Sequence, residues 1–509
     1  MVMLPKLKNV NNFYYMTLGC AVTSLFFLLL SNSSGPSNVR SNQITEVDLK
    51  NLTKRNFEYE EVCREWKHAL HEEKQDKEED LPADEQLMKL DYINWDDDLG
   101  LSSHFRCDNS IRPKQFTQRG KYYVLYNFIQ AEKEFACTES ITLSAPGDFR
   151  FLDNIIELVN YWKGPISVAL YAPGDDFYTT LNAIAYLRNC ADDLIVKLVT
   201  FHLIFDQEHT PKLKDGTFTL LDTYQDTYNC SVQPPWQTVK DADMYKSKNN
   251  LLYPINVARN VAKLAAKTYL VFPSDIELYP SKGFIPLFLK FVRNNLELFT
   301  EGTRNVFVLP IFEVLENQAV PRNKSELLSM LNNKTAFVFH QKVCQLCHKV
   351  IDGDQWIKAK ETSGLDIFSV GKRHGKYGVW EPFFVCTQKE PLWDERMTWE
   401  GQNNKMVQAY TLCEMDYNFY VMDNAYLIHR PGVKKKKDQI KNHYSLVVHD
   451  FQLLKNITKE IQVIYGHNEN CTVSAPAPTR PNNKPEVAGK NQAQKKEQVV
   501  KDNPKKEKV

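Results

Sequence analysis

The stretch "YLVFPSDIELYPS" (Tyr269–Ser281) contains an apolar run that ends at a proline and is followed by two carboxylates, Asp275 and Glu277. The apolar run predicts a short strand that is buried on both faces. Side chains two residues apart in an extended segment point the same way, so we expect both acids to face one crevice. Ligands of open α/β sheets bind outside the carboxyl ends of strands, where this pair lies.

Strand and helix patterns alternate on both sides of this stretch. The alternation predicts an α/β fold with a mostly parallel central sheet covered by helices on both faces. Apolar runs predict strands at 121–129, 141–146, 165–173, 194–201, 269–273 and 305–315, and helical periodicity predicts helices at 150–162, 177–190, 253–268, 288–292 and 405–413.

The N-terminus indicates the compartment. Phe13–Leu30 holds no charged residue and follows Lys6 and Lys8, which predicts a membrane-spanning signal anchor with the rest of the chain in the secretory lumen. A cleaved signal peptide is the alternative. We therefore expect a cytoplasmic tail at 1–12, an anchor at 13–30, a luminal stem at 31–119, a catalytic domain at 120–471 and a disordered tail at 472–509.

Composition and modification motifs agree with this placement. The chain has 63 basic and 63 acidic residues, and this lack of net charge gives no reason to expect a nucleic-acid partner. Of eleven cysteines, one lies in the apolar segment, and the other ten are an even number that can pair in an oxidising compartment. Sequons for N-glycosylation occur at Asn32, Asn51, Asn229, Asn323, Asn333, Asn456 and Asn470.

The acidic pair has two interpretations. Two hard oxygen ligands at the mouth of a sheet suit Mn²⁺ or Mg²⁺, which keep positions open for substrate phosphates. A bare D-x-E is more often a solvated strand end. Its position in the alternation, and the motifs that follow it, favour the metal site.

Five motifs occur in a fixed order from the helix before the acidic pair onward: "YPINVARNVAK", "YLVFPSDIELYPS", "GVWEPFFVC", "WDERMTWEGQNNK" and "AYLIHRPGVK". Over roughly residues 120–440 the chain resembles the LARGE/beta-1,4-glucuronyltransferase type of Golgi glycosyltransferase. The resemblance implies a GT-A fold, a UDP-sugar donor, Mn²⁺ and inversion at the anomeric carbon. It implies transfer of glucuronic acid to a glycan acceptor on a glycoprotein or proteoglycan, as in matriglycan-type glycans, by a type II Golgi membrane protein.

The same resemblance assigns the metal ligands. Asp275 and Glu277 fall on the family's D-x-D motif, with Glu in place of the second Asp, which lengthens its reach by one methylene group. His429, in "YLIHRPG", falls where such folds return a histidine to the metal and the diphosphate.

The catalytic base of an inverting transferase is a carboxylate that takes the proton of the acceptor hydroxyl. The segment Trp393–Lys405 offers Asp394, Glu395 and Glu400. Any of them could instead form a salt bridge or cap a helix. The loop is one residue longer than the family's usual glycine-containing loop, which leaves acceptor recognition open.

Five further residues are candidates for donor binding. Glu381 could bind sugar hydroxyls beside the flat ring of Trp380, although a packed aromatic is an equally good interpretation. Arg259 and Asn260 lie in the helix before the acidic pair, where a cation would offset the diphosphate or a uronate. Thr142 marks the first strands, from which uridine contacts would come.

Two rival functions stay open from the sequence alone. "CQLCHK" (Cys344–Lys349) matches the C-x-x-C-H pattern of c-type haem attachment, so a luminal redox or haem protein is conceivable. Structural disulfides, between these two cysteines or with distant ones, explain the motif more simply. A catalytically weak glycan-binding module that keeps the transferase fold is the second rival.

Overall fold

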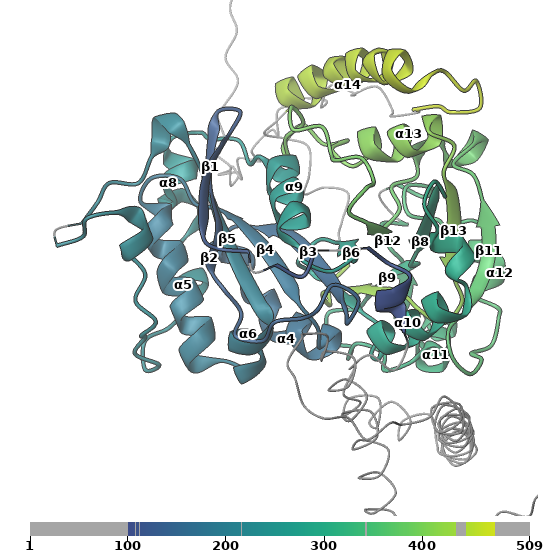
Figure 1. Cartoon of the computed structure of the whole chain (residues 1–509), viewed down its shortest axis with the longest axis horizontal. Helices are drawn as coiled ribbons and strands as arrows, with labels where there is room; N and C mark the ends of the chain where they lie inside the picture. The colour runs from purple at the N-terminus through teal and green to yellow at the C-terminus, as the bar shows by residue number, and fades with distance from the viewer. Residues whose placement is uncertain are drawn as a thin grey trace, which may run out of the picture. The chain divides into compact units, whose positions relative to one another are not determined.

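The computed structural model describes residues 100–106, 108–110, 112–214, 216–341, 344–433 and 444–473 (Figure 1). The chain divides into two compact units, Met1–Tyr92 and Ile93–Val509. All described residues belong to the second unit. The expected signal anchor and most of the expected stem lie outside the described residues, and no helix within the described part is long and apolar enough to span a bilayer.

A large mixed sheet organises the fold. Within the described residues it has ten strands. Their order across the sheet is β1 (Gln115–Arg119), β2 (Tyr122–Ile129), β5 (Val199–Asp206), β4 (Ile166–Tyr171), β3 (Ile141–Gly147), β6 (Leu270–Pro273), β12 (Phe384–Thr387), β8 (Asn305–Val308), β13 (Asn418–Met422) and β11 (Ile367–Gly371).

The centre of this sheet is parallel, as expected. Strands β5, β4, β3 and β6 pair in parallel, and β8 pairs in parallel with β13. Strand β12 is antiparallel to both of its neighbours, β6 and β8. Strands β1, β2 and β11 at the two edges are also antiparallel. The folded unit begins before residue 120, where we expected the stem to end, because β1 is part of the sheet.

Helices cover both faces of the parallel centre. One face packs against the apolar side of α9 (Ile255–Ala265), through Val257, Ala258 and Val261. The opposite face packs against α4 (Asn154–Trp162), α5 (Asp176–Cys190), α6 (Asp193–Leu198) and α10 (Phe284–Asn294). The expected two-sided burial is confirmed.

A second, smaller sheet lies beyond the acidic pair. It has four strands in the described residues, in the order β10 (Ala336–Val338), β9 (Ile311–Val314), β14 (Leu427–His429) and β7 (Leu278–Pro280). The predicted single strand at 305–315 is therefore wrong. It is divided by Leu309 and Pro310, since proline has no N–H for a ladder, and the chain passes from the large sheet (β8) to the small one (β9).

Two further local predictions are wrong. Residues 194–198 are helical (α6) rather than extended, and the strand begins at Val199. The segment after β6 is a turn rather than an extension of the strand, because the N–H of Leu278 donates to the carbonyl of Asp275 at 3.1 Å. Asp275 and Glu277 are therefore oriented by the turn and not by strand alternation.

The C-terminal part packs beside the sheet. Helix α13 (Met406–Glu414) lies next to α14 (Tyr444–Tyr465) (Figure 1). A disulfide between Cys413 and Cys471 joins α13 to the chain that follows α14. The remaining helices are α7 (Pro235–Thr238), α8 (Tyr245–Lys248), α11 (Lys324–Asn332) and α12 (Gly353–Trp356).

Candidate active site

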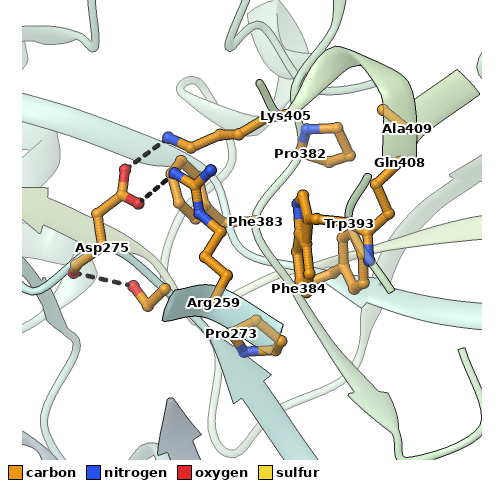
Figure 2. A pocket seen from close by; sticks show the side chains of 11 residues that line it. Arg259, Pro273, Asp275, Pro382, Phe383, Phe384, Trp393, Lys405, Gln408 and Ala409 are labelled. Carbon is orange, nitrogen blue, oxygen red and sulfur yellow. Dashed lines mark hydrogen bonds and ion pairs between the residues drawn. The ribbon is translucent and has the colours of Figure 1, made fainter. Parts of the chain in front are cut away.

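A narrow cavity lies at the carboxyl end of β6, lined by Asp275 together with residues from α9, from the start of β12 and from the end of the 393–405 loop (Figure 2). Two cations contact Asp275 there. Arg259 Nη2 is 2.9 Å from Asp275 Oδ1, and Lys405 Nζ is 2.5 Å from Oδ2. Both carboxylate oxygens are therefore bound by positive side chains.

The two cations are themselves held in position. The second Arg259 nitrogen, Nη1, donates to Asn256 Oδ1 at 2.9 Å and to Asn404 Oδ1 at 2.6 Å. Lys405 precedes the first residue of α13, and its ammonium lies 4.3 Å from the centre of the Phe383 ring. Such a cation–π contact is attractive because the ring face carries partial negative charge. These contacts bring α9 and the 393–405 loop to the end of β6.

The charge balance of the cavity favours anions. Burial alone would raise the pKa of Asp275, but Lys405 and Arg259 lower it well below its usual range. The carboxylate is therefore ionised, and two fixed cations face one anion. This surplus positive charge in a partly buried site suits a diphosphate or a carboxylate ligand.

Glu277 has a different partner from Asp275. Its Oε1 lies 3.1 Å from Nε2 of His429, the last residue of β14. The antiparallel pairing of β14 with β7 sets His429 opposite Leu278, directly after Glu277. The prediction that the chain returns a histidine to the acidic motif is consistent with this arrangement.

Glu277 and His429 form a pair of donors that suits a divalent cation, whereas both oxygens of Asp275 are held by Arg259 and Lys405. His429 Nδ1 donates to the carbonyl oxygen of Arg430 at 2.7 Å, which leaves Nε2 as the ring nitrogen that faces Glu277. Nε2 is buried and makes no aligned hydrogen bond. Two electron-pair donors that face each other at this distance require a proton or a metal ion between them. Oxygen and imidazole ligands are those that Mn²⁺ accepts.

The three candidate bases in the 393–405 loop all have strong partners. Arg396 also contacts Glu460 in α14, so the guanidinium that binds Asp394 is fixed from two sides. None of the three carboxylates lines the cavity at Asp275. The contacts are Arg396 Nη2 to Asp394 Oδ2 at 2.7 Å, Arg119 Nε to Glu395 Oε1 at 2.5 Å, and the Tyr253 N–H to both Glu400 oxygens at 3.0 Å.

Asn260 and Thr142 lie away from the cavity. The amide of Asn260 donates to the Trp393 carbonyl and to Glu395, and accepts from the Trp393 N–H, so it holds the loop against α9. Thr142 is at the start of β3, buried against Thr268 with 2.6 Å between their hydroxyl oxygens. Ligands meet parallel sheets at the opposite, carboxyl end, so Thr142 is placed too early in its strand for a donor contact.

Trp380 and Glu381 are neighbours in sequence with different surroundings. The Trp380 ring is 1% exposed and packs against Phe419 and Tyr377, which leaves no open face for a sugar. Glu381 is partly exposed, and Asp275, Lys405 and Arg259 all act on its pKa. The structure therefore brings Arg259 and Glu381 toward Asp275 and leaves Trp380 in the core.

Two site residues were not singled out by sequence reasoning. Asn404 and Lys405 are the last two residues of the motif "WDERMTWEGQNNK", in which only the acids were predicted to act. A signal for Lys405 was present in the sequence. A lysine directly before a helix has a long side chain that can reach an acid at the end of a neighbouring strand. What the sequence lacks is the packing that places the start of α13 beside Asp275.

The C-x-x-C-H motif forms a local disulfide, Cys344–Cys347. Both sulfurs are therefore bonded to each other, which agrees with the structural interpretation and not with haem attachment. Two further pairs, Cys190–Cys230 and Cys413–Cys471, are present. Cys386 in β12 is a buried free thiol, so the ten cysteines do not all pair as expected.

A family model described as glycosyl-transferase for dystroglycan matches residues 140–466. The chain belongs to this glycosyltransferase family. The match includes Asp275, Glu277, Glu381, Lys405 and His429, so every residue brought together at the end of β6 lies inside the family region.

Curated relatives of this glycosyltransferase family agree. Beta-1,4-glucuronyltransferase 1 of Danio rerio is 27% identical over 338 residues, 62% of this chain and 73% of that protein. The Mus musculus protein of the same name is 27% identical over 287 residues, 55% of this chain and 66% of that protein. Xylosyl- and glucuronyltransferase LARGE1 of Mus musculus is 26% identical over 314 residues, 61% of this chain and 33% of that protein.

Proposed function

We propose that the protein transfers glucuronic acid from UDP-glucuronic acid to a hydroxyl of a glycan acceptor, with inversion at the anomeric carbon and with Mn²⁺ as the cofactor. One observation carries the proposal: an acidic pair, a histidine and two cations converge at the carboxyl end of β6 in a chain of this family. The names of both kinds of relative, beta-1,4-glucuronyltransferase 1 and LARGE1, include the word glucuronyltransferase.

Each charged group has a part in binding the donor. Asp275, Glu277 and His429 would hold Mn²⁺, which supplies positive charge that stabilises the leaving diphosphate. Arg259 and Lys405, which contact Asp275, would bind the donor's phosphate oxygens or its uronate.

The chemistry follows from the position of these cations. The acceptor hydroxyl attacks the anomeric carbon opposite the diphosphate, and a carboxylate takes its proton as the bond to UDP breaks. Arg259 and Lys405 stabilise the charge that develops on the departing UDP without reorganising, since both are already fixed by Asn404 and by Phe383. We also propose that the chain acts in the Golgi lumen as a single-pass type II membrane protein.

The test is UDP release by the full chain in detergent, over a panel of UDP-sugars with xylose, glucose and galactose acceptors. We expect release only with UDP-glucuronic acid, dependent on Mn²⁺ and abolished by a chelator. Asp275→Asn should abolish release while the protein stays folded. As a matched control, Asp354→Asn changes an exposed carboxylate whose partner is Lys349, and should keep full activity.

Other outcomes separate the alternatives. No release with any donor, in a folded protein that also fails to bind UDP with Mn²⁺, would contradict the transferase proposal. Glycan binding that needs no Mn²⁺ and releases no UDP would identify a glycan-binding module instead.

A further inference from the structure

Glu381 lies just before β12, the strand that pairs with β6. The antiparallel ladder of β12 with β6 pairs Cys386 with Val271. Pro382 and Phe383 line the cavity with Asp275 (Figure 2), and Glu381 is the residue directly before them in the chain.

The backbone on both sides of Glu381 is fixed. Its N–H donates to the carbonyl of Cys347 at 2.8 Å, and His348 Nδ1 donates to its carbonyl at 3.3 Å. Both partners belong to the turn that the Cys344–Cys347 disulfide closes. The fully buried guanidinium of Arg373 donates to the carbonyl of Trp380 at 3.0 Å. A residue held in this way from three directions has little freedom to move its Cα atom.

The carboxylate of Glu381 is available, in contrast to its backbone. No described group donates a hydrogen bond to it or forms an ion pair with it, although it lies beside two cations. Asp394 and Glu395 each hold an arginine, and Glu400 holds a backbone N–H. Those acids would have to give up these partners to accept a proton, and an ion-paired carboxylate is a weaker base.

The electrostatic setting also suits proton transfer. Burial raises the pKa of Glu381, Asp275 raises it further, and Lys405, Arg259 and Arg373 oppose the increase. A raised pKa makes the ionised form a stronger proton acceptor. Burial lowers the pKa of His348 well below its usual value, so this neighbouring ring stays neutral and does not compete.

We propose that Glu381 is the general base of the transfer reaction. The inference deepens the proposed function and rests on it. The acceptor O–H bond breaks and its proton moves to the Glu381 carboxylate. The oxygen's electron pair forms the new bond to the anomeric carbon, and the bond from that carbon to the diphosphate oxygen breaks and leaves UDP.

The first experiment compares Glu381→Gln and Glu381→Asp with the unmodified full chain, using UDP-glucuronic acid, Mn²⁺ and the xylose, glucose and galactose acceptors. Removal of a general base reduces turnover by about 10²–10⁴-fold. We expect Glu381→Gln to lose turnover by about 10³-fold. Its affinity for UDP with Mn²⁺, measured by calorimetry, should change less than about 3-fold. Glu381→Asp should recover part of the rate.

A pH profile distinguishes a base from a structural residue. For the unmodified protein, kcat/KM should rise with pH as Glu381 ionises, and this acidic limb should be absent in Glu381→Gln. The other charged and titratable groups around Glu381 are unchanged in Glu381→Gln, so they do not explain the loss of the acidic limb of the pH profile. These groups are Lys405 from the start of α13, Arg259 from α9, Asp275 after β6, Arg373 after β11 and the His348 ring.

Several results would overturn the inference. Glu381→Gln that keeps turnover within tenfold of the unmodified protein rejects it. So does a parallel loss of turnover and of UDP binding, which indicates a structural role. Selective loss of turnover in Asp394→Asn, Glu395→Gln or Glu400→Gln, with Glu381→Gln active, transfers the role to that acid. No UDP release by the unmodified protein removes the proposed function, and the role of Glu381 with it.

Discussion

At the scale of single residues, Asp275 shows what local sequence can and cannot give. An apolar strand followed by an acid is visible in the sequence, so Asp275 could be placed at a strand end. Its contacts with Arg259 and Lys405 could not, because these residues are 16 and 130 residues away, and only the packing of α9 and of the segment before α13 brings them to Asp275.

The Lys405 ammonium gives a prediction about donor affinity. Hydrogen bonds to charged groups contribute about 1.5–3 kcal/mol, which corresponds to roughly 10–150-fold in affinity. Lys405→Gln should weaken UDP binding in the presence of Mn²⁺ by at least tenfold by calorimetry, and Lys405→Arg should restore most of it. Lys389→Gln, which removes an exposed partner of Glu301, is the control. Equal UDP affinity in Lys405→Gln and Lys389→Gln would show that Lys405 does not contact the donor.

Asp148 gives a prediction about pH and stability. It is 1% exposed and accepts from Lys246 at 2.6 Å and from Arg150 at 3.2 Å. Burial alone would raise the pKa of Asp148, but the two cations lower it below its usual value. A lowered folded pKa contributes stability above the unfolded value of about 3.9, and this contribution is lost as pH falls through the folded pKa.

We therefore expect Lys246→Met to lower the free energy of unfolding by about 3 kcal/mol at pH 7, and by clearly less at pH 3. Urea denaturation at both pH values measures this. The exposed Lys389–Glu301 pair provides the comparison, because Lys389→Met should cost less than about 1 kcal/mol. If Lys246→Met lowers the free energy of unfolding by the same amount at both pH values, the ion pair with Asp148 does not have the stabilising role assigned to it here.

At the scale of elements, the errors in the prediction have a common cause. "LIVKL" (Leu194–Leu198) is an apolar run too short for its period to distinguish helix from strand. The deciding signal is the residue before it, since Asp192 caps α6 by accepting from the Leu194 N–H at 2.9 Å. Likewise, the turn at Asp275–Leu278 was missed because an alternating pattern does not show where a strand stops.

The Asp192 cap gives a prediction for α6. Its second oxygen accepts from the side chain of Asn160 in α4 at 2.9 Å, so the residue also joins two helices. Asp192→Ala should lower the free energy of unfolding by about 1–2 kcal/mol, as expected for loss of an N-cap. Asp193→Ala, an exposed acid in the same turn, should change it by no more than about 0.5 kcal/mol. If Asp192→Ala and Asp193→Ala have equal effects in thermal denaturation, the Asp192 cap does not stabilise α6.

At the scale of the whole molecule, the strand–helix alternation predicted the parallel centre and its cover on both faces. It could not predict β12, which comes after more than a hundred residues and enters between β6 and β8 in the opposite direction. Nor could it predict the small sheet, whose strands are only three or four residues long. The candidate site borders both features, so the sequence located Asp275 and Arg259 but not Lys405.

The Cys413–Cys471 disulfide gives a prediction for global stability. It closes a loop of 58 residues around α14, and a loop of this length gives roughly 4 kcal/mol in the chain-entropy estimate, within a typical range of about 2–4. The Cys413→Ser/Cys471→Ser double variant should lose about that much in urea denaturation. It should still bind UDP with Mn²⁺, because none of these residues contacts Asp275. Loss of UDP binding in a folded double variant would show that the C-terminal part supports the site directly.

The insertion of β12 has a consequence for biosynthesis. While the chain is being made, β6 and β8 are complete more than seventy residues before β12 leaves the ribosome. Until then each carries an unpaired backbone edge that can join another chain. Glu381 is synthesised just before β12, Lys405 after it, and His429 after both. A polypeptide released before residue 384 therefore has the acidic pair but neither a continuous sheet nor a complete site, and its unpaired strand edges favour aggregation.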